Sequence, residues 1–134
     1  MLKYEERNVN PKNKKTCDCV VRAITTASGK PYNIVLEDLV KTMIKTGYMI
    51  DEKRCYEKVL DSYGFTKMKQ PRRDDNTKYL VKELDELIDS NKYDVVVSMA
   101  GHLTCVKHNT IVDLWNCGYK TISNYFIRKK EQLN

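Results

Sequence analysis

The chain has 134 residues, of which 41% are hydrophobic and 31% charged, and its formal net charge is +6. Such a chain is long enough for one domain with a buried core, and its composition excludes a disordered protein. No apolar run approaches the roughly 18 residues of a membrane span, and the first residues do not resemble a signal peptide. The lysines are not interleaved with aromatic residues, as they are in many nucleic-acid-binding surfaces. We therefore expect one domain over residues 1–134, in the cytoplasm, that binds neither membrane nor nucleic acid.

The first part of the chain is predicted to be an extended arm followed by helices. Residues 1–16 are polar and aperiodic, and they form the arm. Apolar residues then recur at helical spacing and predict helices over 18–28, 33–46, 51–63 and 77–90. Asp18 is placed to cap the first of these helices, and a glycine follows each of the first three. In the second helix we expect Ile34, Met43 and Ile44 on the apolar face.

The later part of the chain has the β-branched and aromatic runs typical of strands. Strands are predicted over 65–69, 93–98, 102–106, 111–115 and 121–128. The polar residues 107–110 join two of these strands as a hairpin in which Val106 pairs with Ile111. Helices followed by an antiparallel sheet define an α+β fold.

The hairpin register brings a histidine and a carboxylate together. It places four side chains on one sheet face: His102, Thr104, Asp113 and Trp115. An aspartate flanked by apolar residues needs a partner, and the imidazole of His102 lies one diagonal step away. Trp115 is placed to cover this contact from water. A register slip of one residue would give the role of Asp113 to Asn116.

Cys19 stands at the predicted start of the first helix, where a thiolate is favoured. The partial positive charge of a helix N-terminus lowers the pKa of a thiol. An imidazole that accepts the thiol proton and a third group that orients the imidazole complete a nucleophilic site. Cys17 competes for the role of nucleophile but lies in the preceding turn. Asn13, six residues before Cys19, is a candidate to donate its side-chain amide to an oxyanion, beside the backbone N–H of Cys19.

This pattern resembles the papain-like cysteine peptidase superfamily, and within it the double-glycine peptidases that process bacteriocins and related small phage-encoded proteins. Those peptidases place an amide residue, usually glutamine, then four residues, an acidic residue and the cysteine, as in Asn13 and Asp18-Cys19 here. The papain pattern continues with a histidine that begins a strand, then Asn-Ser-Trp, then Gly-Tyr-Ile-Arg. The matching segments here are Gly101-His102, Asp113-Leu114-Trp115 and Asn124-Tyr125-Phe126-Ile127-Arg128.

The resemblance implies a papain-like fold in which Cys19 is the nucleophile, His102 the base, Asp113 the orienting residue and Asn13 an oxyanion donor. Three features depart from the family pattern: asparagine replaces glutamine, Val20 follows the cysteine where glycine is usual, and the interval from histidine to aspartate is short. The activity implied is a thiol hydrolase that cleaves a peptide or isopeptide bond in a protein or peptide substrate, without a cofactor. The alternative is a catalytically degenerate papain-like protein that binds or inhibits a partner, in the host cytoplasm if it is phage-encoded.

The cysteines allow one further alternative, a metal site. Five is an odd number without framework spacing, so free thiols in a reducing compartment are expected. The residues with zinc-ligand chemistry are Cys17, Cys19, His102, Cys105 and Cys117. However, Cys17 and Cys19 lack the usual two to four intervening residues, and Cys105 is predicted to point to the sheet face opposite His102. We therefore predict no metal.

Overall fold

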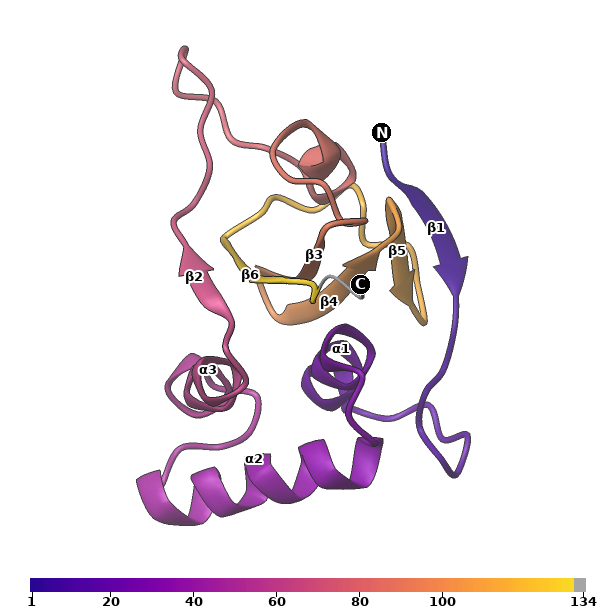
Figure 1. Ribbon diagram of the computed structural model, residues 1–134, viewed down its shortest axis with the longest axis vertical. Helices are drawn as coiled ribbons and strands as arrows, with labels where there is room; N and C mark the ends of the chain where they lie inside the picture. Colours follow the sequence, from indigo (N-terminus) through magenta and orange to yellow (C-terminus); the bar gives the residue numbers. More distant parts are fainter. Residues whose placement is uncertain (132–134) are drawn as a thin grey trace.

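Figure 1 shows the computed structural model of the chain, which describes residues 1–131. The helices are α1 (Cys19–Ser28), α2 (Tyr32–Thr46), α3 (Lys53–Ser62) and the short 3-10 helix η1 (Val81–Glu86). The strands are β1 (Lys3–Glu6), β2 (Thr66–Met68), β3 (Tyr93–Met99), β4 (His102–Lys107), β5 (Thr110–Asp113) and β6 (Asn124–Lys129). The predicted α+β class is confirmed, and the first three helices lie within two residues of their predicted ends.

The sheet has the strand order β1-β5-β4-β3-β6-β2. Every neighbouring pair is antiparallel except β1 and β5, which run parallel. The prediction of an antiparallel sheet is therefore wrong at one edge, and residues 1–16 are not only an extended arm. Strand β1 lacks the alternating apolar pattern by which a strand is predicted from sequence. It is an edge strand, and its pairing with the distant strand β5 stabilises it.

The hairpin of β4 and β5 has the predicted register, in which Val106 pairs with Ile111. Its two loop residues, His108 and Asn109, have φ values of 51° and 57°. Two left-handed residues in a two-residue loop match the right-handed twist of paired strands. Strand β5 ends at Asp113, so Trp115 lies beyond the strand that was predicted to contain it.

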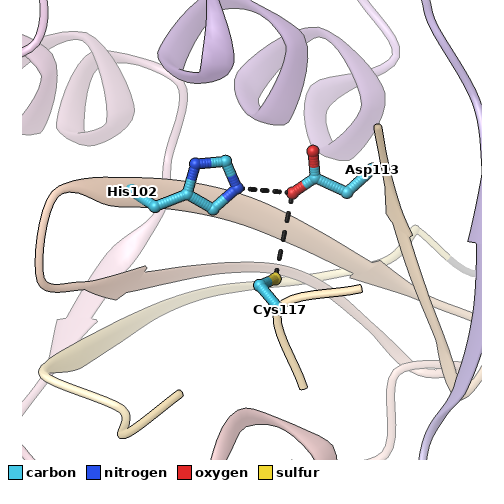
Figure 2. Close-up of side chains that lie close together, drawn as sticks. All are labelled: His102, Asp113 and Cys117. Carbon is cyan, nitrogen blue, oxygen red and sulfur yellow. Dashed lines mark hydrogen bonds and ion pairs between the residues drawn. The ribbon is translucent and has the colours of Figure 1, made fainter. Parts of the chain in front are cut away.

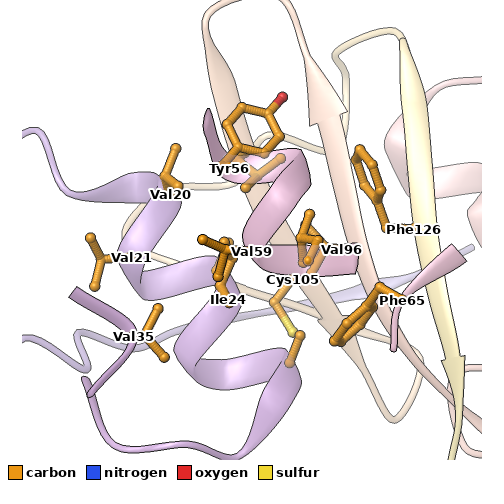
Figure 3. Packing of buried hydrophobic residues seen from close by; sticks show 14 of the residues in the cluster. Val20, Val21, Ile24, Val35, Tyr56, Val59, Phe65, Val96, Cys105 and Phe126 are labelled. Atoms are coloured by element: carbon orange, nitrogen blue, oxygen red, sulfur yellow. The ribbon is translucent and has the colours of Figure 1, made fainter. Parts of the chain in front are cut away.

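The sheet is covered on both faces. Helix α1 packs against β4 and β3, and α2 and α3 pack beside it on the same face. Figure 3 shows this cluster, in which α1 and α3 meet sheet residues such as Val96 and Phe126. The predicted apolar face of α1 is buried: Val20, Val21, Ile24 and Ala27. On the other face, Val81 and Leu84 of η1 pack against neighbouring residues of β3 and β4.

The predicted helix over 77–90 is wrong, because only η1 forms there. The residues before η1 pair with a distant segment instead of continuing a helix. Leu80 forms an isolated bridge with Thr121, and the backbone N–H of Val81 donates to the carbonyl of Lys120. In this non-local pairing, backbone N–H and C=O groups bond to a distant segment and are not available for the hydrogen bonds of a longer helix.

Helix α2 buries a narrower face than predicted. Val35 and Leu39 are buried, but Ile34 is 43% and Ile44 77% exposed, and Met43 is half-buried. The helix lies at the outside of the molecule against α1 and α3, so only one narrow stripe meets the core. At 15 residues α2 is the longest helix, and no helix within residues 1–131 is long and apolar enough to cross a membrane.

Candidate functional site

Cys19 and His102 line the same cavity although they lie far apart in the sequence. Cys19 is the first residue of α1, and His102 is the first residue of β4. The cavity has a volume of about 170 Å³. Its other lining residues are Val20, Asp51, Lys53, Tyr56, Met99, Gly101 and Leu103. A small hollow therefore lies beside a thiol at a helix N-terminus and an imidazole at a strand start.

One ring nitrogen of His102 is held by Asp113. The Nε2 atom lies 2.7 Å from Oδ2 of Asp113, and Figure 2 shows this contact. Thr104 donates its hydroxyl to the same oxygen at 2.6 Å, as the register places it opposite Asp113. The contact with Asp113 leaves Nδ1 as the nitrogen able to exchange a proton with a thiol.

The environment shifts the pKa values of Cys19 and His102 in opposite directions. Burial raises the pKa of the Cys19 thiol, but the neighbouring imidazole of His102, the Leu103 backbone and the charges of His102 and Arg22 lower it overall. Burial lowers the pKa of His102, but the hydrogen bond with Asp113 and the nearby thiols of Cys117 and Cys19 outweigh it and raise that pKa to about 11. Both shifts favour a thiolate beside an imidazolium at neutral pH.

Asp113 is buried, with 2% of its surface exposed, and both of its carboxylate oxygens are bonded. Oδ1 accepts from Nη1 of Arg22 at 2.8 Å and from the backbone N–H of Leu114 at 2.7 Å. Oδ2 accepts from Thr104 and contacts His102. Burial raises the pKa of Asp113, but the hydrogen bonds with His102, Thr104 and Arg22 lower it overall, so the carboxylate is ionised at neutral pH.

Arg22 is a site residue that the sequence analysis missed. It is buried on α1, and its Nε donates to Oδ1 of Asp18 at 2.8 Å while its Nη1 reaches Asp113. Two sequence signals were available: an arginine inside the apolar run around Val21, and an acidic residue four positions before it. Neither signal identifies the distant partner, Asp113.

Asp18 is the N-cap residue of α1, as predicted, but its side chain makes no capping hydrogen bond. Its carboxylate instead accepts from Arg22, from the Tyr32 hydroxyl at 2.8 Å and from the Asn10 amide at 3.1 Å. Burial raises the pKa of Asp18, but these hydrogen bonds lower it overall. Because the Asp18 carboxylate is paired with Arg22, it does not accept hydrogen bonds from the first N–H groups of α1.

Trp115 lies against the imidazole of His102. Their ring centroids are 4.7 Å apart and the ring planes are inclined at 46°. Tyr119 also lies close to Trp115, with ring centroids 6.3 Å apart, and both aromatic side chains are exposed. The indole therefore covers part of His102 from solvent, as predicted, although Trp115 lies beyond the end of β5. Asn116 is used differently, because its Oδ1 accepts from the backbone N–H of Gly118 at 3.0 Å.

Two other predicted site residues are not brought into the cavity. Cys17 is an exposed free thiol in the turn before α1. Asn13 is exposed with a φ of 53°, and among residues 1–131 it does not line the cavity. The backbone N–H of Asn13 donates to the carbonyl of Asn10 and closes a turn in which Asn13 faces solvent. The side-chain amide of Asn10 donates to Asp18.

His102, Asp113 and Cys117 form the group with the greatest resemblance to a metal site. Their ligand atoms lie within 4.8 Å of one another. The Cys117 thiol donates to Oδ2 of Asp113 at 3.9 Å, a contact that Figure 2 marks with a dashed line. An imidazole, a carboxylate and a thiol are zinc-type ligands. However, Arg22 holds the same carboxylate, so a cation there would meet a positive charge. Cys105, one of the cysteines with zinc-ligand chemistry, lies in the apolar cluster beneath α1.

Comparisons of the chain with protein-family models, with curated proteins and with solved structures found no match.

Proposed function

We propose that the protein is a thiol hydrolase with a papain-like fold that cleaves a peptide or isopeptide bond. The observation that carries the proposal is one cavity lined by Cys19 and His102, in which the imidazole is bonded from behind by a buried aspartate. A thiol at a helix N-terminus, a proton acceptor and an orienting carboxylate are the groups that nucleophilic catalysis by cysteine requires. No cofactor is part of the proposal.

In the proposed reaction His102 takes the thiol proton of Cys19 through Nδ1. The Cys19 sulfur then attacks the substrate carbonyl, and His102 returns the proton to the leaving amine as the thioester forms. Water, deprotonated by His102, cleaves the thioester and releases the acid and the thiol. The N–H of Cys19 is one of the first N–H groups of α1, which have no partner within the helix, and it supports the oxyanion.

A second candidate is a catalytically degenerate papain-like protein that binds a partner. Two observations favour it: Asn13 is exposed away from the cavity, and the aromatic pair of Trp115 and Tyr119 is exposed beside His102. Aromatic residues are enriched where proteins bind one another. This candidate keeps the site's geometry but predicts no turnover.

Acyl transfer from an activated ester tests the proposal without a known substrate. The folded protein would be mixed with p-nitrophenyl acetate, and each cysteine would be followed by peptide mass spectrometry while nitrophenol release is recorded. We expect a burst of release with the acetyl group on Cys19, followed by its slow loss. Cys17→Ala should keep the burst and Cys19→Ala should lose it.

Acetylation of Cys17 and Cys19 at similar rates, or acetylation of Cys17 with Cys19 unmodified, would contradict the proposed nucleophile. A stable acetyl group on Cys19 that water does not remove would favour the binding protein instead.

A further inference from the structure

Arg22 connects two aspartates that belong to distant parts of the chain. Its side chain is 8% exposed, and its two ion pairs, with Asp18 and with Asp113, are both 2.8 Å long. A buried arginine is rare unless it is paired, because removing its charge from water is unfavourable. The residue therefore lies at a junction that joins the start of α1 to the end of β5.

The guanidinium decides which oxygen of Asp113 faces the histidine. Arg22 occupies Oδ1, and His102 contacts Oδ2. Without the arginine, Oδ1 would keep only the neighbouring N–H of Leu114, and the hydrogen bond from Thr104 to Oδ2 would be the remaining side-chain bond, besides the contact with His102, that restricts a turn of the carboxylate about its last torsion. Such a turn would loosen the contact that orients the imidazole.

The other end of this junction is fixed as well. Asp18 directly precedes Cys19, and its second oxygen accepts from Tyr32 of α2 and from Asn10 of the N-terminal arm. The junction therefore spans the arm, α1, α2 and β5, and it passes beside the thiol. A planar group with donors along its edge can hold two carboxylates in fixed directions, which a lysine ammonium does not do.

We propose that Arg22 is a positioning residue, whose bridge between Asp18 and Asp113 holds the carboxylate that aims His102 at Cys19. The proposal rests on the proposed thiol-hydrolase function. It assigns Arg22 no contact with substrate. It requires the bridge itself, because the charge alone does not fix the direction of the carboxylate.

The test is the rate of Cys19 alkylation by iodoacetamide against pH, read by peptide mass spectrometry on folded protein. The variants are Arg22→Met, which removes the charge, and Arg22→Lys, which keeps the charge but cannot bridge. The matched control is Arg128→Met. Arg128 also donates twice to a carboxylate, that of Asp94 at 2.8 and 3.0 Å, and its Nη2 bonds the carbonyl of Ser28 at the other end of α1.

We expect the alkylation midpoint of Arg22→Met to rise by about one pH unit or more, so that the rate at about pH 6 falls about tenfold. The alkylation midpoint of Arg22→Lys should rise by a smaller but measurable amount. Arg128→Met should lower the thermal midpoint of unfolding and leave the alkylation midpoint unchanged. If Arg22→Met does not fold, Arg22→Lys decides the question.

An alkylation profile of folded Arg22→Lys identical to that of the unaltered protein would overturn the proposal, as would an equal shift in Arg128→Met. The proposed function fails in a different way. If Cys19 of the unaltered protein titrates as an ordinary thiol with a pKa of about 8.5, the function itself is wrong. If Cys19 is a thiolate near neutral pH and the Arg22 variants keep it so, only the positioning role is wrong.

Discussion

Asp113 accepts hydrogen bonds on both carboxylate oxygens, and each oxygen has a different task. Oδ1 ties the residue to Arg22, and Oδ2 contacts the imidazole of His102. The sequence made the second contact predictable, because a local hairpin register fixes which residues face one another. It did not make the first predictable, because nothing local relates positions 22 and 113. The buried ion pair is a product of packing α1 on the sheet.

At the residue scale, His102 should make protein stability depend on pH. Its folded pKa of about 11 lies above the ordinary value of 6.5, so the charged form is the one that folding favours. The contribution of His102 to stability is then fully present below about pH 6.5 and is lost as the pH rises toward 11. We expect the stability difference between the unaltered protein and His102→Gln to shrink across this interval, as measured by urea unfolding. A difference that is constant over that range would show that the imidazolium is not stabilised.

At the scale of elements, two pieces of backbone bring the site together. Helix α1 supplies Cys19 and Arg22, and the β4–β5 hairpin supplies His102 and Asp113. Strand β1 supports the end of the hairpin, since the N–H of Arg7 donates to the carbonyl of Asp113 at 3.0 Å. The placement of His102 depends further on the tight turn that precedes β4.

That turn contains Gly101, whose φ is +70°, and an added Cβ would meet no atom within 4 Å. Gly101→Ala should therefore destabilise the protein only through its left-handed backbone, by about 1 kcal/mol. Gly29 is a matched control, because it has a φ of +75° and equally open surroundings at the far end of α1. We expect both variants to lose similar stability in urea, but only Gly101→Ala to slow the alkylation of Cys19. An equal slowing in Gly29→Ala would remove the special role of the turn.

At the scale of the whole molecule, local patterns were predictable and non-local pairings were not. Helices α1 and α3 and the β4–β5 hairpin follow from periodicity and turn residues within a few positions. Strand β1 was missed because its four residues gain their order only from a strand more than a hundred residues away. The helix expected over 77–90 failed for the same reason, since Leu80 pairs with Thr121. Asn13 matched a spacing, but the turn that contains it places it in solvent.

The proposed function requires Cys19 and His102 to form a thiolate–imidazolium pair. The most direct test is the alkylation of each of the five cysteines against pH, in the unaltered protein and in His102→Gln. We predict that Cys19 reacts far faster than the other cysteines at about pH 6, more than two units below the pKa of an ordinary thiol near 8.5, and that His102→Gln removes this advantage. A Cys19 that titrates like the exposed Cys17, or that keeps its early reactivity without His102, would contradict the claim.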